Sequence, residues 1–520
     1  STMRASFPPL SRGARTLASE AGRRSYDAVV CGAGIAGVSC AHYLARSGAS
    51  VLLVDSRPPL SHTSSLSTEC YRNFFPGSVP LTAFMQRSVD LLEARAAECD
   101  NAFGLNRRGY WFLSASEEGA AQHALALSDP GLASCGGVSH FSDASHGLRY
   151  RHDAPTGAAA AAAAGGGGGG GGDGPAAMLF SGREAVQAYV GSLPPFLAAD
   201  ASSLLVASRA GWMSAQQMGM ELLSKARDAG AATLIPSSLQ GVRTASDGQV
   251  EAALLSVPGE SEPLEVRTGA VVNAAGPYAG VVDALLRGGG GEGGGGRELP
   301  LQNEVHAKAV LRDDLSAVPG DAPMVVWTDP VTLPWSEEEA EALLEIGGFE
   351  ASLAGSLPGG FHLRPYPGKP HSLLMLWEAI HADVAVPREP PEEAELRGSL
   401  FAELTLRALS RAVPALGGYL GEDGSMTANV SVDGGYYSKA PDNLPLIGPA
   451  AGGPRGAYMC AGLSGYGIMA ANAAGELLAK HVTGAPLPEA YAAGFLPERW
   501  ESEEYRRGVE SGAVGKGFQI

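Results

Sequence analysis

The stretch CGAGIAGVSC, residues 31 to 40, places three glycines in a G-x-G-x-x-G spacing between two segments of different periodicity. YDAVV before it is a short β-branched run, which predicts a strand, and the residues from about Ile35 to Ser47 have the pattern of a helix. SVLLVD then predicts a second strand. These three segments together predict one βαβ unit with a glycine turn between its first strand and its helix.

The glycines of this turn have different physical roles. Gly32 permits a tight exit from the strand, Gly34 lets the backbone approach a pyrophosphate, and Gly37 allows the helix to pack closely on the strand. An anion at the helix N-terminus is stabilised by ~0.3–1 kcal/mol. Asp55 ends the second strand, where an acid can accept hydrogen bonds from ribose hydroxyls. The unit predicts an adenine dinucleotide site and argues against NADP, but it does not separate NAD from FAD.

Composition sets limits on the architecture and the partners. A chain of 520 residues with 45% hydrophobic content must divide its core into at least two lobes. The formal charge of -18 repels nucleic-acid phosphates and anionic lipid. We therefore expect no nucleic-acid partner. No apolar stretch is long and glycine-poor enough to predict a membrane span.

The six cysteines are scattered and form no CxxC pair, so they predict reduced, mostly buried thiols of an intracellular protein. His306, His362 and His371 lack the spacing of metal ligands and an accompanying carboxylate pattern. We expect these histidines in the core or in a pocket, and no metal site.

Residues 1–24 have the composition of a transit peptide. They hold five arginines against one acid, Glu20, with serine and alanine between them. This predicts a soluble protein of an organelle, either mitochondrion or chloroplast. A frayed terminus without a targeting role is the alternative.

The rest of the chain contains segments with strand patterns and segments with helix patterns. Two glycine-rich inserts interrupt it, and we expect both to be mobile surface loops. The predicted class is α/β: a Rossmann-like dinucleotide-binding domain with an interleaved α+β domain built on a mostly antiparallel sheet. The dinucleotide-binding domain is expected over 25–108, 200–299 with an insert at 288–296, and 431–520 with the C-terminal tail. The second domain is expected over 109–199, with an insert at 157–174, and over 300–430.

Three later segments carry a resemblance to a known family. They are HTSSLSTECYRNFFPG at 62–77, GAVVNAAGPYAG at 269–280, and PDNLPLIGPA at 441–450 followed by GAYMCAGLSGYGIMAANAAGELLA. In this order they resemble the FAD-dependent family of D-amino-acid oxidase, glycine oxidase and sarcosine oxidase or dehydrogenase, from about Tyr26 to Phe495. The glycine turn Gly462 to Gly467 opens a helix, so its N–H groups could receive the negative charge of a reduced flavin.

The resemblance implies FAD as the cofactor. The stretch DGGYYSKAPD lacks the cysteine of monomeric sarcosine oxidases, and residues 63–73 lack the histidine of some dehydrogenases, so we expect noncovalent FAD. The residues expected to contact it are Gly32, Gly34, Ile35, Ala36, Gly37, Asp55, Ser56, Arg57, Ser64, Ser65, Val242, Ala274, Ala275, Gly276, Gly462, Ser464, Gly465, Tyr466, Gly467 and Ile468.

The resemblance also implies oxidation of the C–N bond of a small amino acid or secondary amine. Hydride passes to flavin N5 and leaves an imine, so substrate positioning dominates catalysis. An arginine usually holds the substrate carboxylate. Arg364 is the first candidate and Arg72 the second, and a structural ion pair or a flavin contact is the alternative for each. Tyr366 is a candidate for the pocket wall, as are Tyr466 and Trp377, with a place in the core as the alternative.

The electron acceptor and two alternative functions stay open at this point. Met469 stands where sarcosine oxidases carry a lysine near the flavin, so an electron-carrier protein is a candidate acceptor beside oxygen. One alternative is an NAD(P)H-dependent flavin monooxygenase, which shares the opening fingerprint. The other is a non-catalytic organellar assembly or scaffold protein that keeps the fold. The oligomeric state is not indicated.

Overall fold

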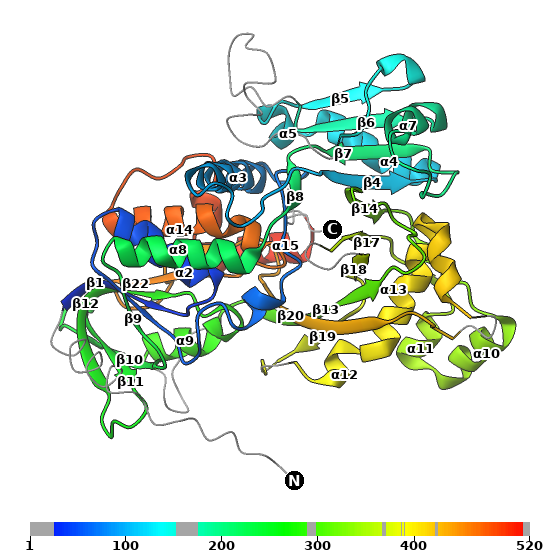
Figure 1. The fold of residues 1–520 in the computed structure, drawn as a ribbon. Helices are drawn as coiled ribbons and strands as arrows, with labels where there is room; N and C mark the ends of the chain where they lie inside the picture. Colours follow the sequence, from blue (N-terminus) through cyan, green and yellow to red (C-terminus); the bar gives the residue numbers. More distant parts are fainter. Residues whose placement is uncertain are drawn as a thin grey trace.

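The computed structural model describes residues 25–151, 175–288, 298–366, 371–385, 387–388, 391–421 and 425–512. The transit-like segment at 1–24 and the insert at 157–174 lie outside these ranges, as does the second insert after Gly288. The described residues form two lobes (Figure 1), each with its own sheet and its own apolar core.

The first lobe contains a sheet of eight strands with the glycine unit at its centre. Its strands are β1 (Ser25–Cys31), β2 (Val51–Val54), β9 (Ala232–Leu234), β10 (Ser238–Thr244), β11 (Val250–Ser256), β12 (Leu264–Asn273), β21 (Leu446–Pro449) and β22 (Ala457–Ala461). Strand β1 lies between β2 and β12 and is parallel to both, with Val29 opposite Leu52 and Val271. All three side chains are fully or almost fully buried, as is typical of a parallel sheet covered on both faces.

Four helices pack together over one face of this sheet (Figure 1): α2 (Ile35–Arg46), α3 (Val79–Glu98), α8 (Ala215–Asp228) and α14 (Gly467–Thr483). Helix α2 therefore matches the predicted span within one residue. The contact between α2 and α14 depends on small residues, because a Cβ on Gly475 would lie 2.5 Å from the Ser39 Oγ. That hydroxyl donates to the carbonyl of Ala471 over 2.6 Å. Segments from near the two ends of the chain therefore pack against each other beside the glycine turn. Helix α9 (Ala279–Leu286) lies near β10.

The second lobe contains a sheet of ten strands, mostly antiparallel. They are β4 (Tyr110–Ser114), β5 (Val138–Phe141), β6 (Ala177–Ser181), β7 (Ser203–Ala207), β13 (Gln302–Arg312), β14 (Met324–Trp327), β17 (Phe361–Pro365), β18 (Ser372–Leu376), β19 (His381–Val384) and β20 (Val430–Lys439). Its helices include α4 (Glu117–Leu125), α7 (Arg183–Val190), α10 (Glu337–Ile346) and α13 (Gly398–Ala412). The short strands β3 (Cys70–Arg72) and β8 (Ala210–Trp212) pair between the lobes.

Two of the predicted domain boundaries differ from the sheet assignments. Strand β7 begins at Ser203, after the boundary at 199, yet it pairs with β4 and β6 of the second sheet. Strand β20 runs to Lys439, beyond the boundary at 430, and pairs with β13 along ten residues. A short apolar strand has the same sequence pattern in either sheet, so its partner could not be deduced from periodicity. None of the described helices is both long and apolar enough to cross a membrane.

Candidate active site

The glycine turn of the first lobe is held by backbone contacts that leave no room for side chains. Gly32 has φ +108°, and a Cβ there would lie 2.3 Å from the carbonyl oxygen of Ala274. A Cβ on Gly37 would lie 1.8 Å from the carbonyl oxygen of Gly32. The start of α2 has no side-chain cap. The first turn of the helix can therefore offer N–H groups to an anion.

Asp55 fixes the shape of this turn. Its Oδ2 accepts a hydrogen bond from the Ala33 N–H over 2.6 Å, and its Oδ1 accepts one from the Arg57 N–H over 3.0 Å. The Ile35 N–H donates to the Ser64 Oγ over 2.9 Å, which ties the segment after β2 to the helix start. A carboxylate and a hydroxyl are thereby placed at the two sides of one loop.

A cavity of about 340 Å³ opens in front of this loop. Both ends of the chain contribute to its wall, because Gly462, Ser464 and Gly467 at the start of α14 lie there together with the glycine turn. Of the residues expected to contact FAD, those that line it are Gly32, Gly34, Ile35, Ala36, Asp55, Ser56, Arg57, Ser64, Ala274, Ala275, Gly276, Gly462, Ser464 and Gly467. A cavity wall with a glycine cradle, an acid and two helix starts is suited to a dinucleotide.

Two smaller cavities continue from this one toward the second lobe. A cavity of about 80 Å³ shares Ile35, Ser64 and Gly467 with the large cavity and reaches Thr68 and Gly465. A cavity of about 30 Å³ then shares Thr68 and Gly465 and extends into the second sheet. The chain of cavities thus runs from the glycine turn, past the start of α14, to the interface between the lobes.

The remaining expected FAD residues lie elsewhere. Gly465 and Ile468 line the 80 Å³ cavity, and Tyr466 lines the smallest one. Gly37 lies behind the loop, in the packing role described above. Two residues do not line any of the three cavities, which corrects their placement. The Ser65 hydroxyl donates to the carbonyl of His62 over 2.7 Å at the surface, and Val242 packs against the apolar cluster of β10 to β12.

Sequence reasoning missed several residues of the large cavity. Val242 was expected to line it, but Ser237, Ser238 and Leu239, three to five residues earlier along the chain, line it instead. Tyr278 and Tyr436 also contribute to the wall. Tyr436 follows two glycines in β20, and its position could be found only once that strand was placed in the second sheet.

Arg72 lines the smallest cavity with its buried guanidinium group. Its Nε donates to the carbonyl of Phe74 over 3.1 Å, and the group lies 4.6 Å from the ring centroid of Phe75. The Arg72 side chain also interacts with Tyr110, and no described carboxylate forms an ion pair with it. Burial lowers the pKa of this arginine, and the neighbouring Tyr110 and Glu378 oppose that effect. A buried guanidinium without a carboxylate partner is suited to bind the carboxylate of a ligand.

Arg364 is placed differently from the sequence expectation. Its side chain is fully buried, and it does not line any of the three cavities. Its terminal nitrogens donate to the carbonyls of Thr68, over 2.6 Å, and Pro365, over 3.0 Å. The guanidinium lies 4.9 Å from the ring centroid of Trp212 and 5.7 Å from that of Tyr366. This geometry supports a structural contact between the lobes, and Tyr366 lies beside that contact rather than in a cavity wall.

Replacing Arg364 by alanine should therefore destabilise the protein. The variant removes the stronger of the two donors to the Thr68 carbonyl, the other being the Cys70 thiol, and opens space beside Trp212, so we expect a loss of about 2–3 kcal/mol in the free energy of unfolding. Denaturant unfolding measures this loss. Arg312→Ala is the control, because the Arg312 side chain is 66% exposed, and should change stability little. An Arg364→Ala variant as stable as Arg312→Ala, but with weakened carboxylate binding, would restore Arg364 to the substrate site.

Glu378 and His362 also line the smallest cavity. His362 was expected in the core or in a pocket but was given no role, and Glu378 was not identified from the sequence. Burial raises the pKa of Glu378 to about 7 and lowers that of His362 to about 4, so the histidine is neutral at pH 7. Tyr110 and Tyr437 complete much of the wall. A signal for Glu378 was present, because it is an acid directly after an apolar run of sequence that ends in Trp377. Trp377 itself is a core residue, and its Nε1 donates to the carbonyl of Pro358 over 3.1 Å.

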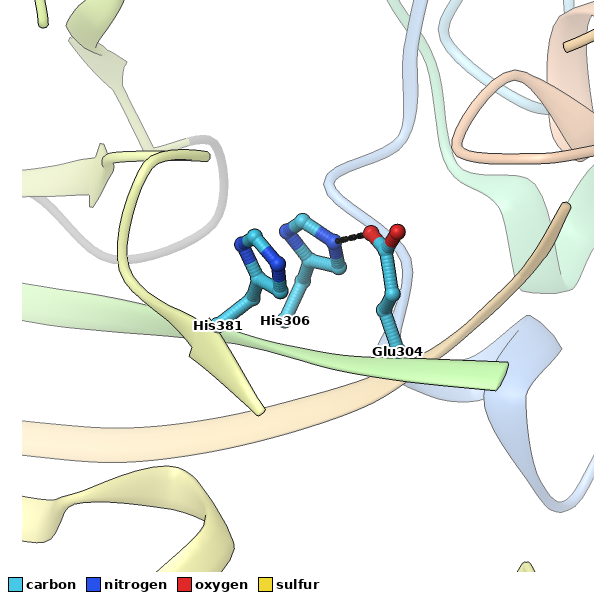
Figure 2. A group of neighbouring side chains, drawn as sticks. All are labelled: Glu304, His306 and His381. Carbon is cyan, nitrogen blue, oxygen red and sulfur yellow. Dashed lines mark hydrogen bonds and ion pairs between the residues drawn. The ribbon is translucent and has the colours of Figure 1, made fainter. Parts of the chain in front are cut away.

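Glu304, His306 and His381 form a cluster of three potential metal ligands, shown in Figure 2, whose ligand atoms lie within 4.8 Å of one another. The His306 Nε2 lies 2.7 Å from the Glu304 Oε2, which also receives the Lys439 ammonium at 2.6 Å. The His306 ring stacks on Tyr437, with centroids 4.0 Å apart. The carboxylate oxygen that a cation would need is already engaged with two donors, so we interpret this cluster as an ion pair and ring stack.

Lys308 is a further basic residue of the site that the sequence did not indicate. It lines the 80 Å³ cavity, where its Nζ donates to the carbonyl of Leu66 over 2.8 Å and pairs with Asp433. Met469, at the position of the expected lysine, lines the smallest cavity. The 80 Å³ cavity is therefore lined by a lysine side chain, but this lysine belongs to β13 and not to α14.

A comparison with protein families decides the identity of this site. A model of the family described as FAD dependent oxidoreductase, abbreviated DAO, matches residues 27–481. The chain belongs to the DAO family. Its cofactor is FAD, and its members are oxidoreductases that act on amino acids or amines. No curated protein sequence matched the chain.

Solved structures show the same fold as this DAO-family chain. L-proline dehydrogenase from P. horikoshii matches with a TM-score of 0.62 and 18% identity, over 92% of this chain and 98% of its own. Glycine oxidase from Geobacillus kaustophilus matches with a TM-score of 0.61 and 17% identity, over 91% and 98%. L-amino acid deaminase from Proteus vulgaris matches with a TM-score of 0.60 and 13% identity, over 96% and 100%. These likenesses establish the two-lobed DAO fold for this chain.

Proposed function

We propose that this protein oxidises the C–N bond of a small amino acid, with noncovalently bound FAD in the chain of cavities. One observation carries the proposal: the smallest cavity, next to the start of α14, is lined by the buried Arg72 guanidinium, which has no ion-pair partner among the described residues. The terminal nitrogens of Arg72 can bind the substrate carboxylate in a bidentate manner. FAD, when bound, supplies a hydride acceptor for the C–H bond next to the substrate nitrogen.

The protein's own groups would hold the cofactor at two places. Ser64 accepts from the Ile35 N–H, so the N–H groups that follow in the first turn of α2, together with Gly34, would face a diphosphate, and Asp55 lies where it can accept hydrogen bonds from ribose. At the other end, α14 begins without a side-chain cap, next to Gly465 and Gly467. Its N–H groups and the Lys308 ammonium place positive charge along the 80 Å³ cavity. Such charge favours the anionic, electron-rich end of a reduced flavin.

The rest of the smallest cavity would orient the substrate and exclude water. The rings of Tyr110 and Tyr437 are buried, and burial raises the pKa of both phenols well above 10, so they stay neutral. A confined site with few water molecules strengthens the attraction between Arg72 and a carboxylate. The small size of the cavity favours substrates with short side chains.

Anaerobic mixing of the yellow holoprotein with candidate reductants tests this proposal. We expect at least one of glycine, sarcosine, proline and D-alanine to bleach the oxidised flavin band. Bleaching by NADPH but by none of the amino acids would support a flavin monooxygenase instead. A flavin that stays yellow with all of them would support a non-catalytic protein that keeps the fold. Reoxidation of the bleached protein in air, compared with reoxidation by an artificial one-electron acceptor, then distinguishes oxygen from a carrier protein as the acceptor.

A further inference from the structure

Glu378 is a second charged group in the smallest cavity, and its carboxylate has no partner. No described residue donates a hydrogen bond to it or forms an ion pair with it. Glu304 nearby differs, because His306 and Lys439 both contact its Oε2. A cavity that contains a carboxylate and a guanidinium, neither of them in an ion pair, is suited to a ligand with both charges. We propose that Glu378 binds the ammonium group of the substrate while Arg72 binds its carboxylate.

The backbone around Glu378 holds the side chain in place. The residue lies two positions after the end of β18, in a turn where the Ile380 N–H donates to the carbonyl of Trp377 over 3.2 Å. The carbonyl of Glu378 itself is bonded to the His381 Nδ1 at 3.0 Å. The side chain therefore extends into the cavity from a fixed turn, opposite the β3 strand that carries Arg72.

Arg72 and Glu378 are close enough to interact electrostatically but do not form a direct ion pair. Burial, the largest effect, raises the pKa of Glu378, and the Lys439 ammonium and then the Arg72 guanidinium lower it. Their nitrogen and oxygen atoms are not within the 4.0 Å of an ion pair. A ligand can therefore be accommodated between them. An α-amino acid has its ammonium and carboxylate on neighbouring carbons, so one small molecule can contact both groups.

This inference rests on the proposed function and restricts the class of substrates that the protein would oxidise. It predicts a zwitterionic α-amino acid, and it disfavours simple carboxylates and amines that lack a carboxylate. A ligand with only one of the two charges would leave the other protein group buried and unpaired, which weakens binding. Glu378 can also accept the ammonium proton. The N–H bond then breaks and an O–H bond forms on Glu378, which leaves the neutral amine that oxidation needs.

The test uses two ligands of the same shape that cannot be oxidised. α-Aminoisobutyrate has no hydrogen on its α-carbon, and pivalate has a methyl group in place of its ammonium. Their dissociation constants are measured on the holoprotein from perturbation of the flavin spectrum and, independently, by calorimetry. We expect the wild type to prefer α-aminoisobutyrate by about tenfold or more, and Glu378→Gln to remove most of this preference. Glu341→Gln, at an exposed position of α10, should preserve it.

The pH dependence tests the same idea on the unmodified protein. The groups that face Glu378 are Arg72 from β3, Tyr437 and Lys439 from β20, Glu304 from β13, Tyr110 from β4 and His362 from β17. With the pKa of Glu304 at about 2 and that of His362 at about 4, neither changes charge between pH 6 and pH 8. Glu378, with a pKa of about 7, gains its charge across this window. Affinity for α-aminoisobutyrate should therefore rise with pH, while affinity for pivalate falls.

Three results would overturn the inference. Equal affinity of the wild type for both ligands, a preference that survives in Glu378→Gln, or binding of neither ligand would each remove Glu378 from this role. Failure of the proposed function is seen separately, in the mixing experiment with reductants. If amino acids bleach the flavin but the preference is absent, only the inference fails. If the preference depends on Glu378 and no amino acid bleaches the flavin, only the proposed reaction fails.

Discussion

Gly37→Ala should yield a protein that is purified without FAD. The new Cβ would lie 1.8 Å from the carbonyl oxygen of Gly32 and 2.9 Å from its carbonyl carbon, and neither backbone atom can rotate away. Helix α2 must then move away from β1, which displaces the N–H groups at its start from the diphosphate. We expect the flavin absorbance per protein to fall at least tenfold, together with a loss of stability of about 3 kcal/mol or more.

Gly280→Ala is the matched control for this variant. Gly280 lies in α9, where an added Cβ would meet no atom within 4 Å, and alanine is the better helix former. Its flavin content should equal that of the wild type. A yellow Gly37→Ala protein with wild-type affinity for FAD would contradict the assignment of this turn to the cofactor.

Arg72→Leu should have the second large effect, on carboxylate binding. Removal of two charge-assisted hydrogen bonds in a buried cavity weakens binding by about 3 kcal/mol, or roughly 100-fold. The dissociation constant of pivalate on the holoprotein measures this loss without any turnover. Flavin content should change little, since Arg72 does not line the two cavities that we assign to FAD.

Arg72→Lys is the control that separates the contribution of the positive charge from that of the guanidinium geometry. A lysine keeps the positive charge but cannot make the bidentate contact, so it should restore only part of the affinity. Unchanged pivalate affinity in both variants would show that the carboxylate is bound elsewhere.

The first lobe could be predicted from the sequence because its determinants are local. The G-x-G-x-x-G spacing, the apolar strand before it and Asp55 after the second strand lie within about thirty residues, and the structure assembles them as expected. The contribution of Gly462 to Gly467 could be predicted only through the family resemblance, since more than 400 residues separate that turn from Gly32.

The substrate side could be predicted less well, because it depends on which strand residues face which cavity. In β17, Phe361 and Leu363 face the apolar core of the second lobe, which leaves His362 and Arg364 on the opposite face. His362 reaches the smallest cavity, whereas Arg364, two residues further along, is covered by Thr68 and Trp212. Alternation along a strand separates its two faces, but it does not say which residue of a face reaches a cavity.

A crystal structure of the protein with bound FAD and α-aminoisobutyrate tests the central claim most directly. We predict one FAD molecule, with its diphosphate at Gly34 and its flavin ring beside Gly465 and Thr68. The ligand's carboxylate should contact Arg72 and its ammonium should contact Glu378. A flavin ring that points away from the second lobe, or a ligand bound outside the cavity of Arg72, would contradict the account.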